Sequence, residues 1–156
     1  MTGRRNRGNP MARKPPTLSK VKKKLWVIFS IYKRKEDGLR TTGSTEWALC
    51  ITCGKRYHFK MLQAGHFIAG RHNAGLFSEK GVHAQCYNCN INLKGNTLEY
   101  RRQIIKLYGE GADLELEQEA KQTKQFKVYE LEEMTVKFKK GLKLLEELKP
   151  TNPLSL

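Results

Sequence analysis

The sequence lacks the features that mark membrane and secreted proteins. It has no apolar run near the roughly 20 residues that span a bilayer, and no apolar stretch follows the charged N-terminus, so we expect no signal peptide. Cysteine is scarce, with four in 156 residues. A disulfide framework is typical of secreted domains, and nothing here indicates secretion. We therefore expect reduced thiols in a cytoplasmic protein with one compact domain and extensions.

Acidic side chains are absent from the first 24 residues, which carry nine basic ones. The whole chain has 30 Lys and Arg against 15 Asp and Glu, a formal charge of +15. An arm of one charge sign repels itself, and it gains by releasing counterions from a polyanion. We predict a disordered basic arm over residues 1–17 and DNA as the partner. A solubilising tail is one alternative. An anionic membrane surface is a weaker one, because bulky apolar residues are missing from the arm.

The four cysteines form two C-x-x-C pairs, Cys50/Cys53 and Cys86/Cys89. Each pair presents two thiolates to one ion, and two pairs together make the closed tetrahedral cage of a structural zinc. Two redox dithiols or two disulfides are the alternatives. We predict that all four cysteines bind one zinc ion.

Apolar spacing predicts a helix at each end of the chain. The first runs from Leu18 to about Lys35, is capped by Thr17 or Ser19, and is followed by a loop. The last covers residues 112–149, and it either packs on the first helix or serves as a dimerising or DNA-straddling helix. Between them we expect short strands at residues 57–59, 62–68 and 82–85, a loop over residues 69–81, and a helix that ends at Tyr108.

His66 lies on a predicted strand between the cysteine pairs, and Asn90 directly follows the last cysteine. This combination resembles the HNH, or ββα-metal, nuclease family. The resemblance implies an α+β fold with a small zinc-braced ββα-metal core, framed by N- and C-terminal helices. It also implies that His66 is a general base, since neutral imidazole is available near pH 7. Asn90 then binds a catalytic Mg²⁺ or Mn²⁺ through its amide oxygen.

Two positions depart from the HNH pattern. Gly65 stands where many members carry Asp or His as a second metal ligand, and Gly81 stands where the middle Asn is expected. His83, on the strand before the second cysteine pair, is a candidate substitute ligand or phosphate contact; a structural role is its alternative. Asn90 equally suits a helix N-cap, which needs no catalysis.

Residues 23–108 resemble more closely the NinG (Rap) recombination-protein family of lambdoid phages. The matching stretches are Leu25 to Tyr32, Cys50 to Gly54, Gln63 to Ile68, Val82 to Cys86, Cys89 to Asn96, and Tyr100 with Arg101. The resemblance implies an endonuclease for branched recombination intermediates, such as D-loops and Holliday junctions, in the cytoplasm of the phage host. The alternatives are a non-catalytic zinc-knuckle DNA-binding or adaptor protein, and a general HNH nuclease for DNA packaging.

Basic side chains near the predicted site are candidate DNA contacts. They are Arg71, His72, Lys94, Arg101 and Arg102. Solvated loop and helix residues are the alternative for each. The expected organisation is a basic arm (1–17), a zinc-braced nuclease domain (18–110), a C-terminal helical extension (111–150) and a tail (151–156).

Overall fold

The computed structural model describes residues 14–70 and 72–148. Its elements are α1 (Leu18–Thr42), β1 (Trp47–Leu49), β2 (Arg56–His58), the 3-10 turn η1 (Phe59–Met61), β3 (Leu62–His66), α2 (Asn73–Leu76), β4 (Val82–Cys86), the π-helical η2 (Asn88–Asn92), α3 (Thr97–Tyr108), α4 (Ala112–Ala120) and α5 (Val128–Glu147). The fold is thus mixed α+β, as expected. Most of the predicted basic arm, the predicted tail and Arg71 lie outside the described residues.

Helix α1 begins as the sequence predicts and ends later than predicted. The Thr17 side chain accepts a hydrogen bond from the Lys20 amide at 3.4 Å, which confirms the N-cap. The helix passes the predicted end near Lys35 and closes at Gly43, whose φ of 72° is left-handed. Tertiary contacts explain the extension. At Gly38 a Cβ would collide with the carbonyl oxygens of Ser44 and Trp47, so glycine allows the loop to pack against the helix.

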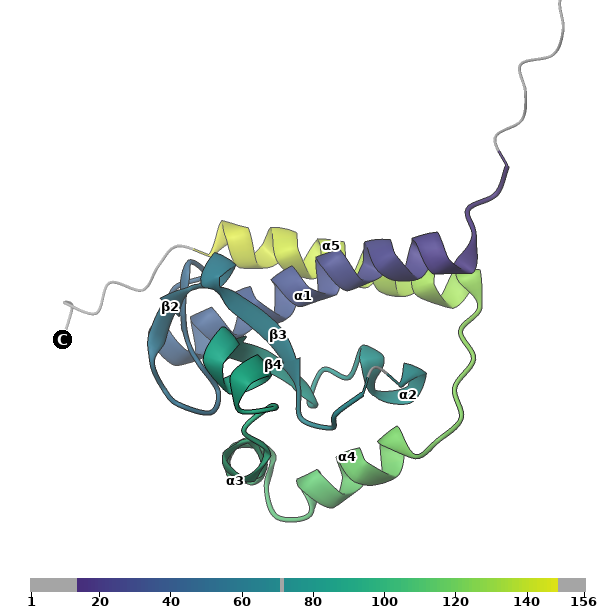
Figure 1. The fold of residues 1–156 in the computed structure, drawn as a ribbon. Coiled ribbons are helices and arrows are strands. Elements are labelled where there is room, and N and C mark those ends of the chain that lie inside the picture. The colour runs from purple at the N-terminus through teal and green to yellow at the C-terminus, as the bar shows by residue number, and fades with distance from the viewer. Residues whose placement is uncertain (1–13, 71, 149–156) are drawn as a thin grey trace, which may run out of the picture.

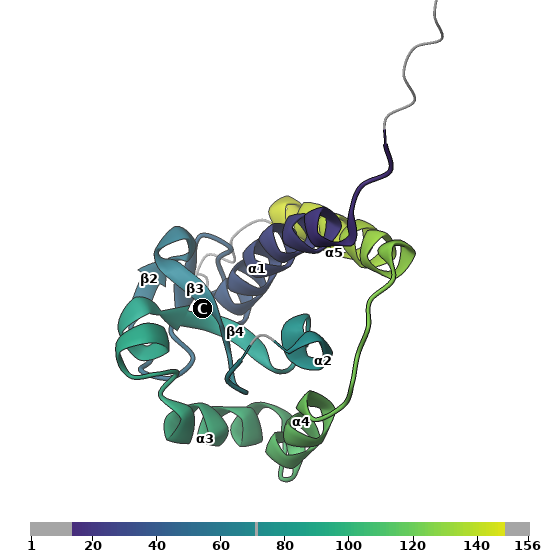
Figure 2. The ribbon, with the colours of Figure 1, turned by 45° about the vertical axis from the view of Figure 1, so that its right-hand side comes forward.

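Helices α1 and α5 lie side by side in Figures 1 and 2 and run in the same direction. Phe29 and Phe138 meet edge to face at 4.9 Å between ring centroids, and Tyr32 also packs on Phe138. The packing alternative for the C-terminal helix is therefore confirmed. The prediction of one continuous helix is wrong: residues 121–127 separate α4 from α5. The break allows Leu116 of α4 to join a different core cluster, around Tyr100 and Ile104.

The strands form two antiparallel pairs, β1 with β2 and β3 with β4. Strand β1 and helix α2 were missed by the sequence prediction, because each is too short to show a periodic pattern. In the second pair Gly65 lies opposite His83, and His66 lies opposite Val82. Figure 2 shows this hairpin between the α1–α5 layer on one side and α3 on the other. The hairpin continues into η2, which carries Asn90.

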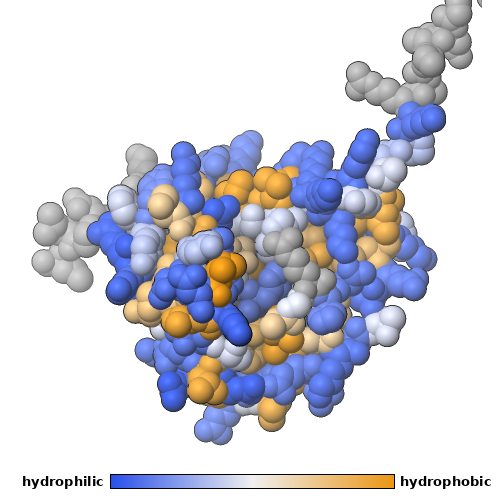
Figure 3. Space-filling view, viewed as in Figure 1, coloured by the Kyte–Doolittle hydropathy of each residue, from blue (hydrophilic) through white to orange (hydrophobic). Residues whose placement is uncertain are grey.

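The visible surface is mainly polar. Figure 3 shows hydrophobic residues as separate patches among hydrophilic ones. None of the helices in the described part of the chain is long and apolar enough to cross a membrane.

Candidate functional site

The two cysteine pairs come together at one point. Their four sulfur atoms all lie within 4.8 Å of one another, so the group can hold a metal ion. The Sγ atoms of Cys53 and Cys86 are 3.9 Å apart. This is close to the edge, about 3.8 Å, of a tetrahedron with Zn–S bonds of about 2.3 Å. All-sulfur donors at this spacing fit zinc.

The thiols of this cage influence one another. Burial raises the pKa of Cys50, but hydrogen bonds from the backbone around Cys53 and Cys86 outweigh it and lower the pKa to about 7. Burial and the neighbouring Cys50 sulfur raise the pKa of Cys53 to about 12. Four thiolates this close repel one another, and a divalent cation among them removes that repulsion.

His66 ends β3, and its imidazole is held on two sides. The ring stacks on Trp26, with centroids 5.3 Å apart and planes 14° apart. Its Nε2 lies 3.1 Å from the Leu76 carbonyl oxygen. A carbonyl can only accept, so this contact favours the tautomer with the proton on Nε2 and the basic lone pair on Nδ1.

A small cavity of about 20 Å³ lies beside His66. His72, Ser78 of the α2–β4 connection and Glu119 of α4 also line it. The structure thus brings the predicted DNA contact His72 next to the predicted base. Glu119 was missed by the sequence prediction, because only the folding of α4 toward α2 places it there.

Asn90 is positioned by a side chain of strand β3 and is not a helix cap. The N-caps of η2 and α3 are Tyr87 and Asn96. The Nδ2 of Asn90 donates to Gln63 Oε1 at 2.7 Å. Because Nδ2 is fixed there, Oδ1 is directed elsewhere, and it lies 3.2 Å from the point where a Cβ of Gly65 would stand.

The side chains of His66 and Asn90 lie on opposite faces of the hairpin. Side chains alternate along a strand, so His66 shares one face with Val82, whereas Gly65 and His83 share the other. Asn90 packs on the second face, beside Gly65. The structure therefore brings Asn90 to the residue preceding His66, and does not place the two side chains on one face.

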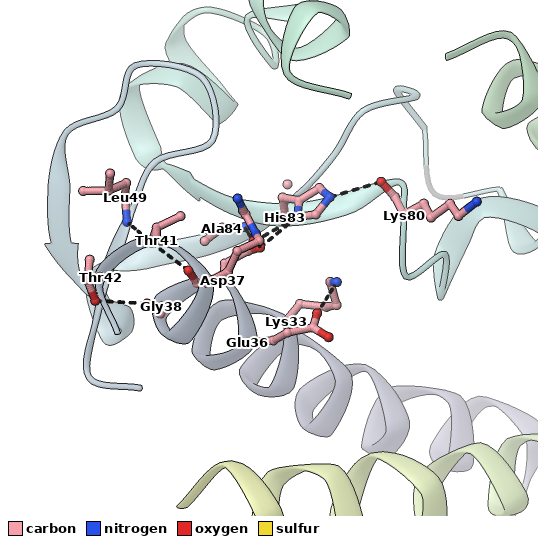
Figure 4. A network of polar contacts seen from close by, with 12 residues as sticks. Lys33, Glu36, Asp37, Gly38, Thr41, Thr42, Leu49, Lys80, His83 and Ala84 are labelled. Atoms are coloured by element: carbon pink, nitrogen blue, oxygen red, sulfur yellow. Dashed lines mark hydrogen bonds and ion pairs between the residues drawn. The ribbon is translucent and has the colours of Figure 1, made fainter. Parts of the chain in front are cut away.

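His83 is buried in a polar network and engages both ring nitrogens (Figure 4). Its Nδ1 lies 2.9 Å and 3.1 Å from the two carboxylate oxygens of Asp37. Its Nε2 lies 3.0 Å from the Tyr108 hydroxyl and 3.2 Å from the Lys80 carbonyl oxygen. These contacts give His83 a structural role, which was the alternative to metal binding. They leave neither ring nitrogen with a lone pair directed at a metal.

A comparison with known families covers nearly the whole chain. Residues 12–148 match the family described as Bacteriophage Lambda NinG protein. The chain belongs to this family. No curated protein and no solved structure matches the chain.

In this NinG-family chain the predicted DNA-contact residues lie in different surroundings. Arg101 pairs with Asp113 and Glu117 and lies over the ring of Phe67, so its charge is already neutralised within the fold. In the part of the chain that the structure describes, Arg102 pairs with Glu99 alone, and its side chain is 73% exposed against 35% for Arg101. Lys94 is exposed in the turn after η2, with a left-handed φ of 50°. Lys94 and Arg102 therefore remain accessible to a polyanion.

Oxygen atoms for a hard divalent cation lie near Gly65. One is Asn90 Oδ1, and another is Oε1 of Gln85, which is buried without a hydrogen-bond partner among the described residues. Mg²⁺ and Mn²⁺ prefer oxygen ligands of this kind. The residues present thus fit such a cation, and Gln85 was missed because only the pairing of β4 with β3 brings its amide oxygen beside Gly65.

Proposed function

We propose that this NinG-family protein is a metal-dependent DNA endonuclease acting on branched recombination intermediates such as D-loops and Holliday junctions. The observation that carries the proposal is the state of His66. His66 lies at the end of β3, directly after Gly65, with its Nε2 3.1 Å from the Leu76 carbonyl oxygen, and a positioned imidazole can act as a general base near pH 7. The hairpin β3–β4 with η2 behind it supports a ββα-metal, HNH-type assignment of this core.

In this proposal His66 takes the proton of the attacking water. The Leu76 carbonyl fixes the tautomer, and the Trp26 ring fixes the ring plane. Both contacts reduce the number of orientations in which the imidazole can meet the water, which is how a positioned base gains its efficiency. His72 and Glu119, which line the neighbouring cavity, are near enough to influence how phosphate approaches.

Asn90 would hold the divalent cation through Oδ1, and Gln63 fixes the orientation of its amide. The cation, Mg²⁺ or Mn²⁺, supplies positive charge to the scissile phosphate. A zinc ion in the cysteine cage would hold the start of η2 against the hairpin, because Cys89 immediately precedes Asn90.

The charge of +15 supports DNA as the partner, since neutralised phosphates release counterions. The host cytoplasm is the compartment where a phage recombination nuclease would meet it. The exposed apolar residues Val136 and Leu144 of α5 permit a homodimer without requiring one. A symmetric cut in a four-way junction would favour that state.

The test is a cleavage assay with a four-way junction, a D-loop, a flap and a matched duplex, each with and without Mg²⁺. The variant His66→Gln keeps a side-chain N–H for the Leu76 carbonyl but has no base. We expect cleavage to fall about 100-fold or more, with zinc content and DNA affinity unchanged. His58→Gln, on the β2 strand, is the matched control. Full cleavage by His66→Gln rules out His66 as the base, and equal cleavage of duplex and junction rules out branch selectivity.

One observation favours a second candidate function. His66 and Asn90 occupy opposite faces of the hairpin, and a zinc-braced DNA-binding or adaptor protein without catalysis does not need them to meet at one phosphate. Such a protein binds junction DNA but cuts none of the four substrates at any Mg²⁺ or Mn²⁺ concentration.

A further inference from the structure

Gln85 of β4 is completely buried, and its amide is held in one orientation. Its Nε2 donates to the Gly95 carbonyl oxygen at 2.8 Å and to Thr52 Oγ1 at 3.2 Å. A carbonyl oxygen accepts and never donates, so the nitrogen must face Gly95. The amide oxygen is therefore forced to the other side, toward Gly65.

The oxygen on that side has no hydrogen-bond partner in the described part of the chain. Leaving a buried acceptor unsatisfied destabilises the fold, so native folds rarely keep one without a reason. Gly65 makes room for this oxygen: a Cβ at position 65 would collide with Oε1. The same point is 3.2 Å from Asn90 Oδ1, so two amide oxygens converge where residue 65 has no side chain.

We propose that Gln85 is the second protein ligand of the divalent cation, binding through Oε1 beside Asn90 Oδ1. This assignment rests on the proposed nuclease function. Gln85 then substitutes, from the neighbouring strand, for the ligand that a side chain at position 65 would provide. His83 does not take this role, because Asp37 and Tyr108 occupy its two nitrogens.

The chemistry of the pair predicts how the cation binds. Both ligands are neutral, so they hold Mg²⁺ or Mn²⁺ more weakly than carboxylates would. A DNA phosphate would add the missing negative charge and further oxygen ligands. Cation affinity should therefore rise when a carboxylate replaces Gln85.

The experiment titrates Mn²⁺ into the zinc-loaded full chain and follows the electron paramagnetic resonance signal of unbound Mn²⁺. Gln85→Met removes the amide at similar length, and we expect Mn²⁺ affinity to fall about 10-fold or more. Gln85→Glu keeps an oxygen toward Gly65, and we expect affinity to rise. Gln103→Met, the same change on α3 where Gln103 binds Glu99, is the matched control and should bind Mn²⁺ like the wild type.

The two Gln85 variants are expected to change the Mn²⁺ affinity in opposite directions. This difference distinguishes a metal ligand from an amide that has only a structural role. If only the Nε2 hydrogen bonds matter, Glu and Met both weaken Mn²⁺ binding, and the assignment is overturned. It is also overturned if Gln85→Met binds Mn²⁺ like the wild type, or if the wild type binds none. Zinc content and thermal melting identify a variant that fails to fold, and the other variant then decides.

Failure of this inference differs from failure of the proposed function. If the wild type and Gln85→Met both cut DNA and bind Mn²⁺ with equal affinity, only the ligand assignment is overturned. Gln85-dependent Mn²⁺ binding by a protein that cuts no DNA supports the assignment and overturns the nuclease function.

Discussion

Asp37 accepts a hydrogen bond from His83 across 46 positions of the sequence, and both side chains are buried. The same carboxylate accepts the backbone N–H of Ala84 at 2.6 Å and pairs with Arg40. Figure 4 shows Asp37, near the end of α1, in contact with His83 and Ala84 of strand β4. Since β4 ends at Cys86, this pair links the long N-terminal helix to the cysteine cluster and the candidate site.

Replacing Asp37 should destabilise the whole fold. Asp37→Ala leaves the N–H groups of His83 and Ala84 buried without their acceptor, and removing one partner of a buried pair costs about 3–5 kcal/mol. Urea unfolding measures the loss. Glu132→Ala, which removes an exposed carboxylate from α5, is the control and should change stability by less than about 0.5 kcal/mol. Equal stability of the two variants would contradict a structural role for the network.

The same pair predicts how acid affects stability. Burial raises the pKa of Asp37, but the hydrogen bond and charge of His83, with Lys33 and Arg40, outweigh it and lower the pKa from 3.8 to about 2. A carboxylate whose pKa is lower in the folded state than in the unfolded state stabilises the fold at pH values above its unfolded-state pKa. This contribution disappears as the pH falls through about 2. It is on the order of 2 kcal/mol. The stability difference between the wild type and Asp37→Asn should thus shrink from pH 6 to pH 2.5. A constant difference would exclude this linkage.

Removal of the metal should unfold the central part of the chain. Among the described residues, the cluster around the cysteines contains Ala48, Leu62, Ala84 and part of Tyr57 besides the sulfurs, too little apolar surface to hold the two cysteine turns together without a metal ion. A strong chelator should therefore lower the melting temperature and the circular dichroism signal, in step with zinc loss by atomic absorption. Zinc loss with unchanged dichroism and melting is the contrary result.

Adjacent arginines on α3 should behave differently in DNA binding. Arg102→Ala should weaken DNA binding and reduce the slope of log affinity against log salt by about 1, because Arg102 is mostly exposed. Arg101→Ala should instead lower stability and leave the salt slope unchanged, since Asp113 and Glu117 already neutralise Arg101. Fluorescence anisotropy at several salt concentrations distinguishes them, and identical slopes for both variants would refute the distinction.

Much of the local structure could be predicted from the sequence. The Thr17 cap, the strand that carries His66 and the strand before Cys86 follow from short-range patterns. The later end of α1 could not be predicted, because it depends on Gly38 meeting the loop near Trp47. The break between α4 and α5 was missed for a related reason: both helices carry apolar stripes, but these face different core clusters.

The sequence by itself determined the sulfur cage, because cysteine spacing within a tight turn decides which thiolates can share an ion, and it determined the basic character of the surface. Only the tertiary structure decided the partners of the polar side chains. His83 became a structural residue because Asp37 folds against it, and Gln85 became a candidate ligand because Gly95 and Gly65 direct its oxygen. Those contacts join residues far apart in the chain, and a hydrogen bond depends on distance and direction in space, which spacing along the sequence does not specify.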